Sequence, residues 1–155
     1  MPLKPPFHKQ ETLYSCVPAC LRMVLGSFGV DISESELRTR CDCTPYGTDA
    51  LMAVDAARAL GFVKTAKYTL SLAELQRVVT DGHCPIVFVD LNPIDGLDAI
   101  HAMVVADVSG QEVVVLDPLQ GERRLPVYVF TAARARRHNL ALLVVREHIR
   151  LCADP

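Results

Sequence analysis

The stretch that decides the fold is Gln10–Arg22, which reads Gln-Glu-Thr-Leu-Tyr-Ser-Cys-Val-Pro-Ala-Cys-Leu-Arg. Its polar first half gives way at Cys16 to an apolar run with helical spacing, and Pro18 is tolerated in the first turn of a helix. This pattern predicts a helix that begins at Cys16. The unpaired N–H groups and the positive end of the helix dipole favour a thiolate there. Gln10 lies six residues upstream of Cys16, close enough to offer its side-chain amide to an oxyanion forming on a bound substrate.

The composition is that of a globular protein. Of the 155 residues, 50% are hydrophobic and 22% are charged, which predicts a single domain over residues 1–155 with residues 1–9 as an extended arm. The net charge of −2 gives no reason to expect a nucleic acid partner. We expect Arg134, Arg136 and Arg137 to form a solvated helix face. No apolar run reaches the ~20 residues of a membrane span, and residues 1–9 lack the apolar core of a signal peptide, so we expect a cytoplasmic protein.

The cysteines do not form a recognisable framework. There are six of them, namely Cys16, Cys20, Cys41, Cys43, Cys84 and Cys152. In a cytoplasmic chain disulfides are not expected. The spacing of Cys41, Cys43, His83 and Cys84 matches no common zinc pattern, so we expect no metal and no cofactor. Most of these thiols, Cys20 included, are expected to be small buried residues.

The spacing of hydrophobic residues changes halfway along the chain from one typical of helices to one typical of strands. The first half predicts helices at residues 16–28, 33–40, 49–60 and 71–79. It also predicts one strand, at residues 62–69. The second half predicts a series of strands, at residues 85–91, 100–106, 112–116, 124–129 and 140–146, with a loop at 92–96 and a helix at 130–137. Because the turns between successive strands are short, the sheet is expected to be antiparallel. The fold class is therefore α+β, with N-terminal helices packed on a C-terminal sheet.

A cysteine nucleophile needs a general base and a group that orients it. Among the five histidines only His101 opens an apolar strand, and the following strand ends at Asp117. A hairpin that turns at Ser109-Gly110 would place these two side chains opposite each other. Asp117 could then fix the orientation of the imidazole ring. The alternative is a satisfied core histidine and an unrelated turn aspartate.

Several motifs together resemble one family. In chain order they are Gln10-x5-Cys16-x3-Cys20-Leu21-x-Met23-Val24-Leu25, Gly47-Thr48 ahead of a helix, Leu60-Gly61-Phe62, His101-x-x-Val104-Val105 and Asp117-Pro118-x-x-Gly121. This ordered set, over about residues 8–146, resembles the bacteriocin-processing cysteine peptidases, the double-glycine leader peptidases of the papain-like superfamily. The resemblance implies a papain-like fold. It also implies that Cys16 is the nucleophile, His101 the base, Asp117 its orienter and Gln10 the oxyanion donor.

The resemblance further implies hydrolysis of a peptide bond after small residues, as in a Gly-Gly leader or tail, through a thioester intermediate. The partners expected are a peptide or protein substrate and a partner protein or transporter on a separate chain. The family usually has an acidic residue and a glycine on either side of the cysteine, where this chain has Ser15 and Val17. Val17 could narrow or close the cleft, and we expect Val17, Tyr14, Tyr46 and Gly47 to contact the substrate.

Two other functions stay open at this point. A catalytically silent peptidase-like module could bind a leader peptide or a protein partner without cutting it. A papain-like acyltransferase would use the same residues but pass the thioester to an amine instead of water.

Overall fold

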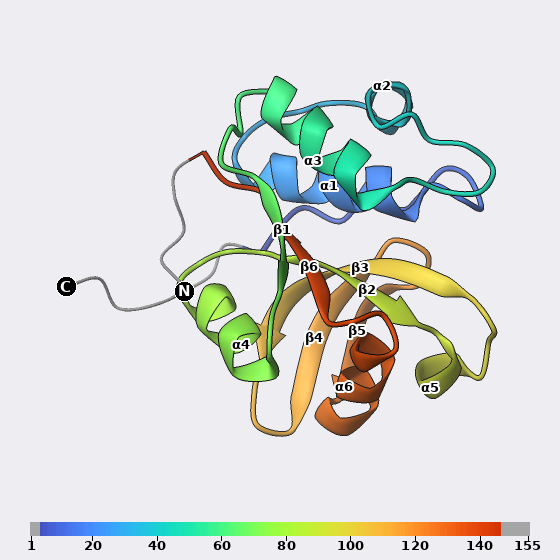
Figure 1. The fold of residues 1–155 in the computed structure, drawn as a ribbon, viewed down its shortest axis with the longest axis vertical. Coiled ribbons are helices and arrows are strands. Elements are labelled where there is room, and N and C mark those ends of the chain that lie inside the picture. Colours follow the sequence, from blue (N-terminus) through green and yellow to red (C-terminus); the bar gives the residue numbers. More distant parts are fainter. Residues whose placement is uncertain (1–3, 147–155) are drawn as a thin grey trace.

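The computed structural model describes residues 4–146 (Figure 1). The helices are α1 (Cys16–Ser27), α2 (Glu34–Arg40), α3 (Ala50–Ala59), α4 (Leu72–Thr80), α5 (Asn92–Asp95) and α6 (Val127–Ala135). The strands are β1 (Ala66–Thr69), β2 (Ile86–Asp90), β3 (Ile100–Val108), β4 (Glu112–Asp117), β5 (Gly121–Pro126) and β6 (Leu140–Leu143). Cys152 lies outside the described residues, and the prediction of one domain over residues 1–155 stays a prediction.

The strands form one antiparallel sheet in the order β1-β6-β2-β3-β4-β5. Strands β2 to β5 follow one another as a meander, whereas β6 returns from the end of the described chain to insert between β1 and β2. By pairing with both β1 and β2, the last strand connects the strand of the first half of the chain to the strands of the second half. The antiparallel pairing predicted from the short turns is confirmed.

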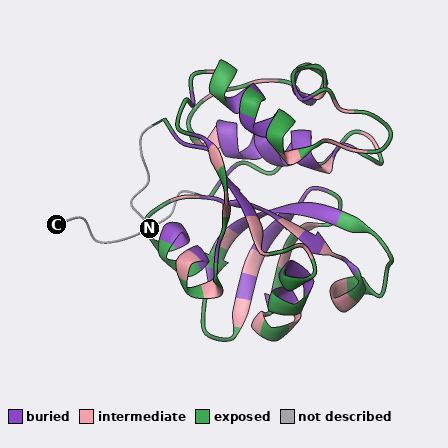
Figure 2. Ribbon diagram, in the orientation of Figure 1, coloured by how far each residue is buried: buried purple, intermediate pink, exposed green. Residues whose placement is uncertain are grey.

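Helices cover both faces of this sheet. Successive residues of β3 alternate between two hydrophobic cores, as the period of a strand requires. Ala102 and Val104 belong to the core shared with α1, α2 and α3, and Met103 and Val105 belong to the core shared with α4 and α6. Buried residues accordingly concentrate where the helices face the strands (Figure 2). The predicted packing of N-terminal helices on a sheet is confirmed, and α4 and α6 add a second helical layer.

The predicted helix starts agree with the caps in the structure. Asp49 precedes α3 and its side chain accepts the Leu51 N–H at 2.8 Å. Ser71 and Glu74 form a reciprocal capping box at the start of α4, which satisfies two backbone donors that would otherwise lack partners. Other predicted elements were wrong in part. Residues 92–95 form the short helix α5 in a segment expected to be a loop. The strand expected at 124–129 is β5, which begins at Gly121, and residues 127–129 belong to α6 because Pro126 precedes that helix as its N-cap. Residues 62–65 precede β1 without forming a strand.

The N-terminal segment, residues 4–9, carries no helix or strand and packs against the end of α1 at Gly26. A side chain at Gly26 would meet the ring of Pro6, with a Cβ 2.7 Å from Cγ, so the glycine permits this close packing. Lys4 pairs with Glu122 on β5. The segment therefore touches both the helical layer and the sheet before it enters the stretch that leads to Cys16.

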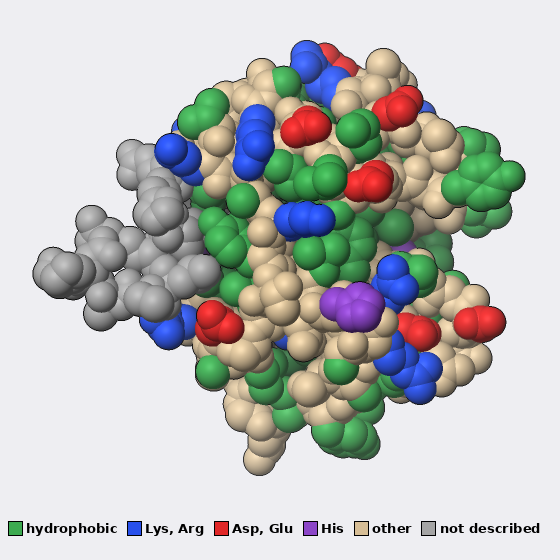
Figure 3. Space-filling view, in the orientation of Figure 1, with side chains coloured by type: hydrophobic (Ala, Val, Ile, Leu, Met, Phe, Trp, Pro, Cys, Tyr) green, Lys and Arg blue, Asp and Glu red, His purple; other side chains and the backbone are tan. Residues whose placement is uncertain are grey.

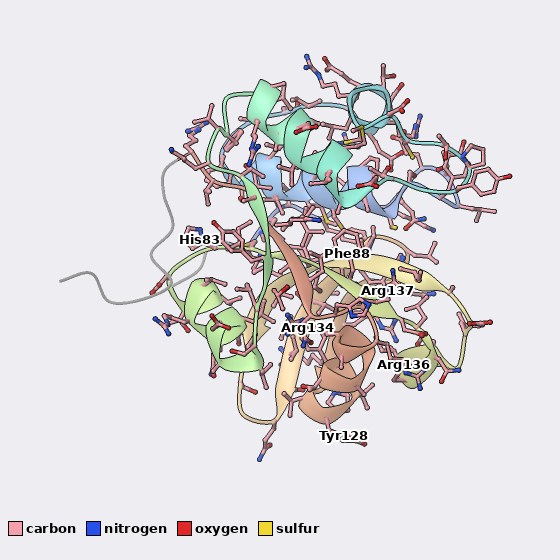
Figure 4. All side chains as sticks on the ribbon, in the orientation of Figure 1. His83, Phe88, Tyr128, Arg134, Arg136 and Arg137 are labelled. Atoms are coloured by element: carbon pink, nitrogen blue, oxygen red, sulfur yellow. The ribbon has the colours of Figure 1, made fainter. Side chains whose placement is uncertain are left out.

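The arginine cluster near residue 135 is only in part the solvated face that the sequence predicts, because Arg136 is exposed but Arg134 is buried. Arg134 is only 2% exposed, and its guanidinium donates to the carbonyl oxygens of Leu70 (2.8 Å) and Asn139 (3.2 Å) (Figure 4). Burial lowers the pKa of Arg134 to about 10. The expectation failed because the carbonyls that Arg134 satisfies come from two turns that only the folded chain brings together.

We expect Arg134→Met to lower the free energy of unfolding by about 2 kcal/mol, because the buried Leu70 carbonyl loses its donor while the apolar stem is kept. Urea denaturation measures this change. Arg124, whose side chain is 64% exposed and pairs with Glu112, supplies the control, and Arg124→Met should stay within about 0.5 kcal/mol of the unsubstituted protein. Equal losses in both variants would contradict the role assigned to Arg134.

Among the described residues, no helix combines the length and apolar character needed to cross a membrane.

Candidate active site

Cys16 is the first residue of α1, as the sequence predicts, and it is partly exposed. The side chain of Ser15 does not cap the helix. It instead accepts the Thr12 N–H at 3.1 Å and so closes the preceding turn. The N-terminus of α1 is therefore left without a side-chain cap at Cys16, an arrangement that favours negative charge there.

His101 and Asp117 meet inside the protein, close to Cys16. The distance from His101 Nε2 to Asp117 Oδ1 is 2.7 Å, and the two residues are 6% and 1% exposed. Because Nε2 is engaged by the carboxylate, Nδ1 is the ring nitrogen available to Cys16. The predicted pairing of His101 with Asp117 is confirmed as geometry.

The register that brings them together differs from the one expected. Val104 pairs with Leu116, so Asp117 lies diagonally from His101 across the two strands and not directly opposite. A β-bulge between Val105 and Asp107 shifts the pairing towards the turn. At the end of the strands that carries His101, the observed pairing differs from the expected pairing by an even number of residues. The side chains of His101 and Asp117 therefore stay on the same face of the sheet, within reach of each other.

Both carboxylate oxygens of Asp117 accept hydrogen bonds. Oδ1 also accepts the Leu119 N–H at 2.9 Å, and Oδ2 accepts from the Arg123 guanidinium at 3.1 Å. Arg123 in turn pairs with Asp95 at 2.6 Å. This second cation was not predicted from the sequence, since an arginine on an edge strand looks like any solvated charge. It holds the carboxylate in position from the side opposite His101.

These contacts set the charge states. Burial alone would lower the pKa of His101, but hydrogen bonding to Asp117 and Cys16, together with their charges, raises it to about 9. Burial would raise the pKa of Asp117, and the His101, Leu119 and Arg123 contacts lower it instead. Near neutral pH the pair is therefore an imidazolium and a carboxylate.

Gln10 is buried, and its backbone N–H donates to the carbonyl of Pro118 at 2.8 Å, immediately after Asp117. Its side-chain Nε2 donates to the Thr12 carbonyl at 2.8 Å, while Oε1 is buried without a hydrogen-bond partner among the described residues. Because an amide nitrogen carries two protons, one N–H of Gln10 is left for another acceptor.

A buried carboxylate anchors the segment that contains Gln10. The N–H of Glu11 donates to Glu34 Oε1 at 2.9 Å, and Arg38 pairs with both Glu34 and Glu11. Sequence reasoning missed this contact, because Glu34 looks like an ordinary acidic residue in the first turn of a helix. The anchor fixes the turn between the N-terminal segment and α1.

A pocket of about 510 Å³ opens beside Cys16, with His101 in its wall. Val17, Tyr46 and Gly47, which the sequence predicts to contact the substrate, also line it. Val17 is only 4% exposed and packs into the core under α1, so it narrows the floor of the pocket without closing it. Figure 3 shows this hollow between the helical half and the sheet, with a hydrophobic floor and blue and purple side chains at its rim.

The loop that carries Tyr46 is held by two hydrogen bonds between Thr44 and Gly47, of 3.1 and 2.8 Å. Gly47 has a φ of +99°, a left-handed conformation that favours glycine. The turn projects the fully exposed Tyr46 ring at the mouth of the pocket. Tyr14 is not among the residues that line the pocket, and its carbonyl faces the Cys43 thiol at 3.8 Å.

Among residues 4–146, no group of three or more His, Cys, Asp or Glu side chains is placed to hold a metal ion. The five cysteines described, Cys16, Cys20, Cys41, Cys43 and Cys84, are all free thiols. The chemistry that the site offers is therefore that of a thiol beside a charged, oriented imidazole.

A helix that begins with a cysteine, packed on an antiparallel sheet that carries a histidine and an aspartate, defines the papain-like fold of cysteine peptidases. Comparison with known families is consistent with this class. Residues 4–133 match the model of the peptidase C39 family. The chain belongs to the peptidase C39 family, and its resemblance to double-glycine leader peptidases is confirmed.

Solved structures of this family have the same fold. The peptidase domain of Streptococcus ComA, a bifunctional ABC transporter of a quorum sensing pathway, is 26% identical, with 89% of this chain and 96% of that chain covered and a TM-score of 0.75. A double glycine motif protease from an AMS/PCAT transporter, solved in complex with the leader peptide, is 22% identical, with 91% of both chains covered and a TM-score of 0.74. A C39-like peptidase from Bacillus anthracis is 16% identical, with 92% and 94% covered and a TM-score of 0.78.

An uncharacterized protein of the archaeon Methanothermobacter marburgensis is 30% identical over 123 residues, which cover 79% of this chain and 78% of that protein.

Proposed function

We propose that this protein is a cysteine peptidase that hydrolyses a peptide bond after small residues, of the Gly-Gly type found at the end of a leader or tail. One observation carries the proposal: His101 is bound to Asp117 at 2.7 Å and lies in the wall of the same pocket as Cys16. The solved double glycine motif protease in complex with the leader peptide supports the substrate class. A transporter or other partner on a separate chain would deliver the peptide.

The Cys16 thiolate attacks the scissile carbonyl, and an oxyanion forms on the former carbonyl oxygen. The remaining N–H of Gln10 and the backbone N–H of Cys16 stabilise that oxyanion. His101 donates its proton to the leaving amine, and the C–N bond breaks to leave a thioester on Cys16. Water then attacks the thioester while His101 takes its proton, and the acid product leaves as the thiolate is restored.

The small residues of the substrate are expected at the narrow floor beside Val17. Tyr46 and Gly47 would contact the extended peptide on one wall, and Tyr14 would contact residues beyond the pocket. The five free thiols among the described residues favour action in the reducing cytoplasm.

The test is incubation of the purified chain with short peptides that contain a central Gly-Gly, followed by mass spectrometry of the products. We expect cleavage after Gly-Gly with a free carboxylate on the new C-terminus, and none with Cys16→Ala. Gly-Gly replaced by Val-Val in the peptide is the matched substrate control. Binding without cleavage would favour a silent module, and a product joined to an added small amine would favour an acyltransferase.

The pH dependence of cleavage should follow the charge on His101. The pKa of His101 is raised from 6.5 to about 9, so the protonated ring that serves the leaving amine is present below pH 9 and is lost as the pH rises through that value. We expect kcat/KM to fall above about pH 9. Asp117→Asn removes the charge that raises this pKa, and the fall should move to lower pH. An alkaline limb at the same pH in both proteins would contradict the assignment.

A further inference from the structure

The far end of the pocket, away from Cys16, is basic. Lys67 on β1 and Arg137 and His138 in the turn between α6 and β6 all line it. These two segments are neighbours because β1 pairs with β6, with Thr69 opposite Leu140. In Figure 4, Arg137 and Phe88 lie near each other on the side of the sheet towards the helical half, and both line the pocket. The basic side chains therefore share one cavity with the catalytic pair.

Within the described part of the chain the charge of this end is compensated only in part. Asp49 is the acidic residue among those that line the pocket, and its carboxylate already accepts the Leu51 N–H as the cap of α3. No ion pair or side-chain hydrogen bond within residues 4–146 involves Lys67 or Arg137. The neighbouring Arg136, by contrast, pairs with Asp90 at 3.5 Å.

Two polar atoms of the cavity residues are buried without partners among the described residues. One is Nε of Arg137 and the other is Oγ1 of Thr48 on the opposite wall. A desolvated donor without an acceptor is costly, and an oxygen-bearing ligand would remove that cost. A guanidinium binds a carboxylate with two parallel hydrogen bonds, so a carboxylate is the group that fits best.

The backbone presents these side chains from a fixed turn. His138 and Asn139 both have left-handed φ values, of +61° and +55°, a conformation that asparagine tolerates and that few other residues besides glycine adopt. Arg134 holds the turn, because its guanidinium donates to the Asn139 carbonyl and its own carbonyl accepts the Asn139 N–H at 3.0 Å. Such strained turns persist where the surrounding structure fixes them, often at binding sites.

We infer that Lys67, Arg137 and His138 form a subsite for an acidic side chain of the peptide substrate. The inference rests on the proposed function and names the substrate class more closely, as a Gly-Gly peptide with Asp or Glu near the scissile bond. The pocket is continuous with Cys16 and an extended peptide advances about 3.3–3.6 Å per residue, so we place the acidic residue within about four positions of that bond.

The experiment measures peptide binding to the Cys16→Ala protein by fluorescence anisotropy, so that cleavage does not interfere. Peptides amidated at the C-terminus carry a central Gly-Gly and a single Glu moved through successive positions on either side. Each is paired with the same peptide carrying Gln. At one position we expect Glu to bind about tenfold more tightly than Gln, and the advantage to shrink as salt is added. A free-acid version of the Gln peptide tests whether a terminal carboxylate serves as well.

The added substitutions Lys67→Gln and Arg137→Gln, made together, should abolish the advantage of Glu. The control pair is Lys64→Gln with Arg124→Gln, which removes the same charge outside the pocket and should keep that advantage. Replacing Lys67 and Arg137 together by Glu should reverse the preference, so that a Lys peptide binds more tightly than the Glu peptide. This reversal also shows that the altered protein has folded.

Equal binding of Glu and Gln peptides at every position would overturn the subsite, as would an advantage that survives the loss of Lys67 and Arg137. Failure of the proposed function is seen separately, in the protein that retains Cys16. If that protein cuts Gly-Gly peptides but ignores their charge, only the subsite is wrong. If it prefers acidic peptides but cuts none of them, the subsite stands and the peptidase proposal is wrong.

Discussion

Replacing His101 by alanine should lower kcat/KM for a Gly-Gly peptide by about 10⁴- to 10⁶-fold, the range seen when the base of a nucleophile–histidine pair is removed. The variant loses both the group that keeps Cys16 reactive and the proton donor for the leaving amine. Alkylation by iodoacetamide isolates the first of these effects, because it has no leaving amine. At about pH 6 we expect Cys16 to react about tenfold more slowly in His101→Ala, since an imidazolium no longer stabilises the thiolate.

His83→Ala is the matched control. His83 is a half-buried histidine at the other end of the sheet from Arg137 (Figure 4), and burial lowers its pKa. Its loss should leave both cleavage and alkylation unchanged. Cys43, which is also partly exposed, serves as an internal standard for alkylation. If Cys16 reacts no faster than Cys43 in the unsubstituted protein, the thiolate–imidazolium pair does not exist and the mechanism fails.

The second large effect is expected at Gln10. Removing one oxyanion donor typically costs about 10²- to 10³-fold in kcat, and we expect that loss for Gln10→Ala. Alkylation of Cys16 should not change, because that reaction forms no oxyanion. Stability should change little, since the substitution removes the bond to the Thr12 carbonyl together with an Oε1 atom that has no partner among the described residues.

Gln76→Ala controls for a merely structural effect. The amide of Gln76 also donates to a backbone carbonyl, that of Val108 at 3.3 Å, but lies on α4 outside the pocket. Its substitution should leave kcat unchanged. Loss of Cys16 alkylation in Gln10→Ala would mean that Gln10 shapes the start of α1 and does not act on the oxyanion.

The sequence was sufficient for the parts of the fold and site that depend on local chemistry. The helix start at Cys16, the caps at Asp49 and Ser71, and the short turns of the meander each follow from neighbouring residues. The meeting of His101 with Asp117 was predicted from a wrong register. It nevertheless held, because an even shift keeps side chains on the same face.

What could not be predicted depends on segments that are distant in sequence. The bulge between Val105 and Asp107 has no glycine or proline to mark it. The burial of Arg134 depends on turns at residues 70 and 139, and the basic end of the pocket depends on β6 returning to pair with β1. A sequence pattern gives the chemical type of such residues but not their neighbours, which is why an arginine predicted to be solvated was found buried.

The separation of Cys16 from its partners along the chain has a consequence for synthesis on the ribosome. His101 follows Cys16 by 85 residues (101 − 16), and translation at about 5–20 residues per second takes about 4–17 s to cover that distance. During that interval the nascent chain carries the Cys16 thiol without the His101 imidazole, and β3 and β4 have yet to emerge. On the proposed mechanism an unfinished chain cannot cleave peptides, and cleavage becomes possible only once β4 has paired with β3.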